Sequence, residues 1–205
     1  HPQLHLISDD IYEHLVYDDF KFVTMATIAP DLQDRILTVN GVSKSYCMTG
    51  WRIGYGSGPV PLIKAMAKVQ SQSTSSPNSM AQYAAIAALD GPLDFMAENR
   101  AAFARRRQLV CEALNNIDGI DCPLPDGAFY VYPSIAKLIG KKRPDGKIIE
   151  SDSDFVSYLL EAGEVAVVPG VAFGLSPYFR ISYAAADDVL ADAMQRIAKV
   201  TASLS

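Results

Sequence analysis

The chain has 205 residues, 49% of them hydrophobic and 20% charged, an ordinary globular composition with enough material for one large or two small domains. Its net charge of −5 argues against a nucleic-acid or anionic-membrane partner. The three cysteines lack metal or redox spacing and no apolar run reaches about 18–20 residues, so we expect free thiols, no metal site and a cytoplasmic location.

The first part of the chain alternates short apolar runs with helical periodicity, a pattern typical of α/β domains. Three runs predict strands, at residues 4–8, 35–40 and 52–58. Two segments predict helices, one following Pro61 and one at 79–89, with a polar break at 71–77 between them.

A long helix is predicted over residues 92–117, because Met96, Phe103, Val110 and Ile117 recur every seven residues. Its length of about 39 Å is enough to connect two domains. The arginine run at 105–107 is expected on its solvated face.

The last part of the chain predicts a smaller α+β domain over residues 118–205. Strands are expected at 127–133, 165–168 and 178–183, and a loop with a turn at 137–147. A helix at 154–163 is expected to end with Gly163 as its C-cap, and Asp187 and Asp188 open a final helix.

The segment GVSKSYCMTGWRIG (41–54) contains one lysine, Lys44, among small residues. Such a lysine can be a solvated surface residue, a phosphate ligand or a covalent amine. A Ser-x-x-Lys dyad is excluded because position 41 is glycine. Ser43 and Arg52 add a hydroxyl and a fixed cation, which suit a phosphate monoester. An amine beside a phosphate site is what pyridoxal phosphate requires.

Pyridoxal phosphate also needs an acid at its ring nitrogen, and the segment ISDDIY (7–12) offers one. Asp9 lies at the end of the first predicted strand, where α/β folds place ligand-contacting residues. Tyr12 could donate to the ring's phenolic oxygen, and Ile11 could pack on the ring face. Helix capping and a metal-binding carboxylate pair are the alternatives, the second disfavoured because no third ligand has suitable spacing.

Together these motifs resemble the fold-type-I, class-I pyridoxal-phosphate-dependent aminotransferases, the aspartate aminotransferase superfamily. GVSKSYCMTGWRIG is similar to that family's lysine motif and DDIY to its Asp-x-x-Tyr motif. The resemblance implies that Lys44 binds the cofactor covalently and that Ser43 and Arg52 bind its phosphate. It also implies that Asp9 contacts the pyridine nitrogen and Tyr12 the phenolic oxygen. YFRISYA (178–184) resembles the family's closing strand, which implies that Arg180 binds the substrate's α-carboxylate.

The resemblance also implies an α/β fold of type I and a particular domain organisation. Residues 1–91 would be the C-terminal part of the cofactor-binding large domain, 92–117 an interdomain helix and 118–205 the small domain. Family members are about twice as long, so we expect the C-terminal half of a homodimeric enzyme that acts on amino acids and 2-oxo acids. A lyase or synthase on the same fold, or a catalytically silent fragment, remains open, and we expect little turnover by these 205 residues alone.

Overall fold

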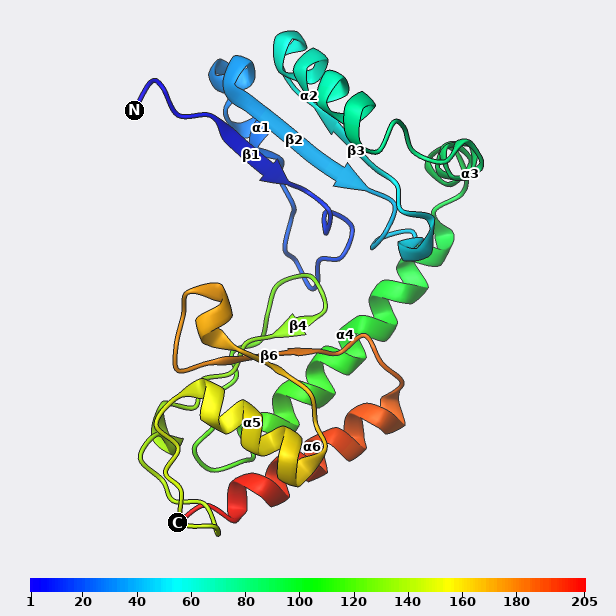
Figure 1. Cartoon of the computed structure of the whole chain (residues 1–205). Coiled ribbons are helices and arrows are strands. Elements are labelled where there is room, and N and C mark those ends of the chain that lie inside the picture. Colours follow the sequence, from blue (N-terminus) through cyan, green and yellow to red (C-terminus); the bar gives the residue numbers. More distant parts are fainter. The chain divides into compact units, whose positions relative to one another are not determined.

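The computed structural model describes residues 1–205 and divides into two compact units, His1–Asn99 and Arg100–Ser205 (Figure 1). Each unit has its own three-stranded sheet with helices beside it. None of the helices is both long enough and apolar enough to span a membrane.

The first unit contains β1 (Leu6–Asp9), α1 (Met25–Ile28), β2 (Ile36–Gly41), β3 (Gly54–Ser57), α2 (Val60–Ser73), α3 (Ser79–Asp90) and the start of α4 (Asp94–Asn115). Strand order is β1-β2-β3, with β1 parallel and β3 antiparallel to β2. The three predicted strands are confirmed, although β1 and β3 are shorter than expected, and α2 extends into the predicted polar break as far as Ser73.

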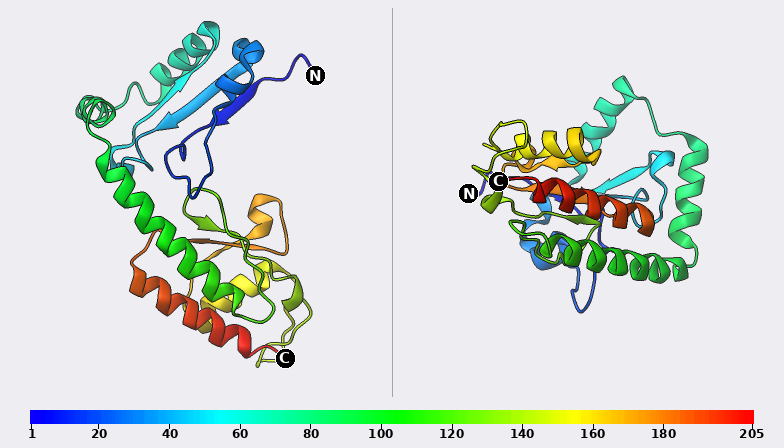
Figure 2. Two further views of the ribbon diagram at one scale, coloured as in Figure 1. Left: turned by 180° about the vertical axis from the view of Figure 1, so that it is seen from behind. Right: turned by 90° about the horizontal axis from the view of Figure 1, so that it is seen from below.

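The second unit contains the rest of α4, β4 (Tyr130–Val131), α5 (Asp152–Gly163), β5 (Val168–Pro169), β6 (Phe179–Ser182) and α6 (Asp187–Ala202). Its sheet is antiparallel, in the order β4-β6-β5. Both views of Figure 2 show α4 and α6 side by side. The expected strand at 127–133 is reduced to two residues, since Ala128 has a positive φ of 59° that interrupts extended backbone.

A continuous hydrophobic core fills the second unit. Its largest fully buried side chains come from each layer, including Leu114 of α4, Phe155 and Leu159 of α5, Phe179 of β6 and Ile197 of α6. The seven-residue pattern predicted for α4 supplies part of it, because Val110 and Ile117 are buried there. Close packing of this kind makes each large side chain costly to remove.

Two expectations about helices are wrong: the arginine run at 105–107 does not lie wholly on a solvated face, and Gly163 is not the C-cap of α5. Arg105 and Arg106 form ion pairs with Asp187 at 3.0 and 2.7 Å, but Arg107 is buried and donates to the Pro125 carbonyl oxygen at 2.9 Å. The C-cap of α5 is Glu164, in the left-handed conformation, and Gly163 is the last helical residue.

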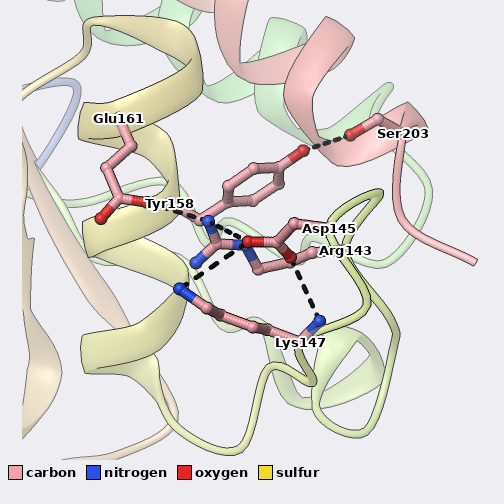
Figure 3. Close-up of polar contacts among 6 residues, drawn as sticks. All are labelled: Arg143, Asp145, Lys147, Tyr158, Glu161 and Ser203. Atoms are coloured by element: carbon pink, nitrogen blue, oxygen red, sulfur yellow. Dashed lines mark hydrogen bonds and ion pairs between the residues drawn. The ribbon is translucent and has the colours of Figure 1, made fainter.

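The loop before α5 is fastened by Arg143 (Figure 3). Its guanidinium lies 4.4 Å from the centre of the Tyr158 ring and forms ion pairs with Asp145 at 3.1 Å and Glu161 at 2.8 Å. Tyr158 in turn shares a hydrogen bond of 2.7 Å with Ser203, after α6. The predicted loop with a turn is therefore joined to α5 by stacking and charge, and Tyr158 links α5 to the end of α6.

Neighbouring leucines on α5 test this description of the second core. Leu159→Ala should reduce the free energy of unfolding by about 2–5 kcal/mol, because Leu159 is fully buried and its removal leaves a cavity. Leu160→Ala is the matched control and should change it by less than about 0.5 kcal/mol, since Leu160 is 56% exposed. Urea unfolding followed by far-ultraviolet circular dichroism measures both. Equal effects of the two substitutions would contradict the assigned core.

Candidate functional site

The candidate site in the first unit lies where β1 and β2 end. The two strands pair in parallel from Leu6 opposite Ile36 to Asp9 opposite Val39. The pairing is extended by the Asp10 N–H, which donates to the Val39 carbonyl oxygen at 2.9 Å. Parallel strands have their carboxyl ends at one edge of a sheet, so Asp9 and the segment that follows Gly41 emerge at the same edge.

The two aspartates after β1 have different surroundings. Asp9 is exposed, and its Oδ1 accepts the Ile11 N–H at 3.3 Å in a local turn. Asp10 is buried and accepts the Ser8 hydroxyl at 2.7 Å. Neither caps a helix, because residues 11–14 form turns. Asp9 is therefore the carboxylate available to a ligand, and Asp10 has a structural role.

The segment after Asp10 is tied to the end of β2 by a pair that the sequence did not reveal. The Asn40 amide donates to Glu13 Oε1 at 2.6 Å, and Asn40 Oδ1 accepts the Gly41 N–H at 2.7 Å. The pKa values of Tyr46 and Tyr55 are raised, mainly by burial and secondly by the negative charge of Glu13. Glu13 thus provides negative charge at this edge and helps to fix the turn that carries Tyr12.

Lys44 lies in a turn between β2 and β3. The turn is closed by the Cys47 N–H, which donates to the Lys44 carbonyl oxygen at 3.2 Å, and by the Met48 N–H, which donates to the Val42 carbonyl oxygen at 3.3 Å. Val42 is fully buried and packs with Ala81 and Ala85 of α3. The backbone beneath the partly buried Lys44 is therefore anchored in a small core.

Gly41 allows the two motifs to approach each other. A Cβ atom at this position would lie 2.9 Å from the Ile53 carbonyl oxygen and 3.3 Å from Cδ1 of Ile11. The first contact is with backbone and is closer than a carbon atom tolerates, so a side chain here would displace the start of β3. The structure thus brings Ile11 against the strand that leads to Lys44.

Arg52 follows a short 3₁₀ turn, Thr49–Trp51, and has a left-handed backbone with φ 55°. Cys47, on the other side of this turn, also has a positive φ of 56°, a conformation that non-glycine residues adopt rarely and most often at functional sites. Arg52 Nη1 donates to the Thr49 carbonyl oxygen at 2.9 Å, which orients a guanidinium that carries five donors in total. Ser43, the other predicted phosphate ligand, is partly buried beside Lys44.

Trp51, at the end of this turn, is 49% exposed. Together with Arg52 it lines a surface pocket of about 810 Å³ whose other walls are the end of α2 and the start of α3. This volume is within the usual range of small-molecule sites.

Arg180 belongs to the second unit, on β6, and its surroundings are described separately from those of Lys44. Its guanidinium carbon lies 4.5 Å from the centre of the Tyr130 ring and 4.3 Å from that of Phe173. Both rings lie within the distance of cation–π contact with the guanidinium. The sequence did not indicate this aromatic pair, which restricts where the Arg180 guanidinium can lie.

The donor set in the first unit fits pyridoxal phosphate chemically. It offers a primary amine, a hydroxyl with a guanidinium for a phosphate, and an exposed carboxylate for a protonated ring nitrogen. No cluster of three or more histidine, cysteine, aspartate or glutamate side chains that could bind a metal ion occurs in the chain.

The fold and the lysine-bearing edge define a class, that of the pyridoxal-phosphate-dependent enzymes of fold type I, of which this chain matches the C-terminal part. Residues 1–197 match the family described as aminotransferase class I and II. The chain belongs to this family.

Individual relatives support the assignment. The chain is 62% identical to the aspartate/prephenate aminotransferase of Cereibacter sphaeroides, covering all of this chain and 51% of that protein. It superposes on the crystal structure of the Rhizobium meliloti aspartate aminotransferase with a TM-score of 0.97 at 57% identity, covering 100% of this chain and 51% of that one. The aromatic aminotransferase of Pyrococcus horikoshii matches with a TM-score of 0.84 at 38% identity, over 96% and 51% of the two chains. The chain thus spans about half the length of its relatives and corresponds to their C-terminal half.

The contact at Gly41 gives a test of how the site is assembled. Gly41→Ala should reduce the stability of the first unit by about 1–3 kcal/mol, because its Cβ would meet the Ile53 carbonyl oxygen at 2.9 Å. Gly50→Ala is the control, since a Cβ there meets nothing within 4 Å. Denaturant unfolding followed by the fluorescence of Trp51, the only tryptophan, reports on this unit. If Gly41→Ala leaves the stability of the first unit unchanged, the close approach at Gly41 does not constrain the site.

Proposed function

We propose that the chain forms the C-terminal half of a pyridoxal-phosphate-dependent aminotransferase of aspartate type. One observation carries the proposal: parallel pairing of β1 with β2 brings Asp9 and the Lys44 turn to the same edge of the sheet. Membership of the aminotransferase family supports it. The first unit would be the C-terminal part of the cofactor-binding domain, the second unit the small domain, and α4 the helix that connects them.

Six side chains would hold the cofactor. Lys44 binds its aldehyde carbon covalently through Nζ, and Ser43 with Arg52 binds its phosphate. The Asp9 carboxylate keeps the ring nitrogen protonated, and the Tyr12 hydroxyl donates to the phenolic oxygen. Ile11, whose side chain lies beside Gly41, packs on the ring face.

When bound, pyridoxal phosphate supplies an electron sink for the bond that breaks at the substrate's Cα. Once the substrate's amino group has replaced it on the cofactor, the freed Lys44 Nζ would be the base that takes up the Cα proton and passes it on during amino transfer. Arg180 binds the α-carboxylate of the amino acid through two parallel N–H donors, with Tyr130 and Phe173 fixing its plane. The charge of Asp9 stabilises the protonated ring throughout.

The substrates proposed are an L-amino acid of the aspartate type and a 2-oxo acid, by analogy with relatives named aspartate or aspartate/prephenate aminotransferase. We propose a cytoplasmic homodimer, as is typical of the family. Several apolar side chains on α2 and α3 are strongly exposed and could pack against further protein, among them Val69, Met80 and Tyr83.

The proposal is tested in an enzyme in which this chain is completed by the N-terminal half of an aspartate aminotransferase. Lys44→Ala should lower kcat by at least about a thousandfold, because both the covalent amine and the proton-transferring base are lost. Lys64→Ala, on an exposed position of α2, is the control and should leave kcat within about twofold. The assay measures two quantities: the 2-oxo acid formed from the amino-acid donor, and the acceptor 2-oxo acid that is consumed.

Equal amounts of the two 2-oxo acids would identify amino transfer. A product formed without consumption of the acceptor would instead indicate a lyase or a synthase. A Lys44→Ala enzyme whose kcat equals that of the wild type would contradict the proposed role of this residue.

A further inference from the structure

Cys111 and Cys122 lie together in the second unit and take no part in the proposed function. Their sulfur atoms are 3.8 Å apart, and the Cys122 thiol donates to the Cys111 sulfur. Both side chains are buried, at 4% and 2% exposure, and both are thiols in the structure. This pair could not be predicted from the sequence, because eleven positions separate the two cysteines and no CxxC spacing exists.

The backbone holds the two cysteines in register. Cys111 lies on α4, one turn before Asn115, and the Asn115 side chain makes two hydrogen bonds to the backbone of Cys122. Its amide donates to the Cys122 carbonyl oxygen at 2.9 Å, and its Oδ1 accepts the Cys122 N–H at 2.8 Å. This two-point contact fixes the segment after Asp121 against the last turns of α4.

A surface pocket borders the pair. It has a volume of about 380 Å³ and is lined by both cysteines, by Gln108, Glu112 and Asn115 of α4, and by Leu124. The pocket is large enough for several water molecules and hence for a peroxide. Both cysteines therefore lie at the boundary between this pocket and the hydrophobic core of the second unit.

The two sulfurs are electronically different. The hydrogen bond from Cys122 lowers the pKa of the Cys111 thiol; burial opposes this, and the positive charge of Arg107, one helical turn earlier, assists it. The same hydrogen bond and burial raise the pKa of Cys122 far above its usual range. Cys111 is thus the better nucleophile, and Cys122 keeps its proton.

We propose that Cys111 and Cys122 form a redox-active pair that closes to a disulfide on exposure to a hydroperoxide. The Cys111 thiolate attacks the peroxide oxygen, the O–O bond breaks, and Cys111 becomes a sulfenic acid while hydroxide leaves. The Cys122 sulfur then displaces the sulfenic oxygen, which leaves as water once the Cys122 proton has been transferred to it. Two thiols are oxidised by two electrons, and one hydrogen peroxide is reduced to two waters.

The final step needs little movement. The sulfurs must approach from 3.8 Å to about 2.05 Å, while Asn115 holds the backbone of Cys122. The new bond would join the end of α4 to the segment that leads into the β-sheet of the second unit.

The test uses the protein carrying Cys47→Ser, which removes the exposed third thiol. Limited hydrogen peroxide should remove both remaining thiols in equal amounts and lower the intact mass by two hydrogen atoms. Trypsin cannot separate the two cysteines, since no lysine or arginine lies between them, but cleavage after Glu112 does. The resulting peptides should remain joined until a reductant is added.

Single substitutions test the order of the steps. With Cys122→Ser, Cys111 should be trapped by dimedone as a sulfenic acid; with Cys111→Ser, Cys122 should react at least about tenfold more slowly. Folding of each variant is checked by circular dichroism. Overoxidation of Cys111 without a crosslink in the Cys47→Ser protein would overturn the proposal. Two thiols that remain unreacted, or equal reactivity in the two single variants, would overturn it as well.

Discussion

The parallel pairing of β1 with β2 is the constraint on which the candidate site depends. Asp9 and Lys44 are far apart in the sequence, and only the register that pairs Asp9 with Val39 brings their segments to one edge. A shift of one residue would turn Asp9 to the opposite face of the sheet, since strand side chains alternate. The hydrogen bond from the Asp10 N–H to the Val39 carbonyl oxygen and the Asn40–Glu13 contact oppose such a shift.

The two units position their functional groups by different means. In the first unit, Lys44 rests on a small cluster of four buried residues, and the site is shaped by a glycine and by two residues with positive φ. In the second unit, an extensive core supports β6, and Arg180 is oriented by aromatic stacking. Local backbone geometry therefore determines the surroundings of Lys44, and packing determines those of Arg180.

The family and the candidate site residues of the first unit could be predicted from the sequence, because the motifs around Lys44 and Asp9 are local and their residue types are specific to the chemistry. The order of strands and helices also followed from periodicity. Contacts that depend on tertiary packing could not be predicted, such as the Tyr130 and Phe173 rings around Arg180 or the pairing of Cys111 with Cys122.

The mistaken expectation for the arginine run has a clear physical cause. Successive helical residues are about 100° apart, so three consecutive arginines cannot share one face, and Arg107 turns inward to donate to the Pro125 carbonyl oxygen.

The central claim is that Lys44 is the residue that binds pyridoxal phosphate, and reductive trapping tests it most directly. The completed enzyme is loaded with the cofactor, reduced with borohydride and digested with trypsin. Because trypsin does not cut after a modified lysine, the account predicts one labelled peptide that runs from Ile36 through Lys44 to Arg52. A label on Lys64, on Lys68 or spread over several lysines would contradict it.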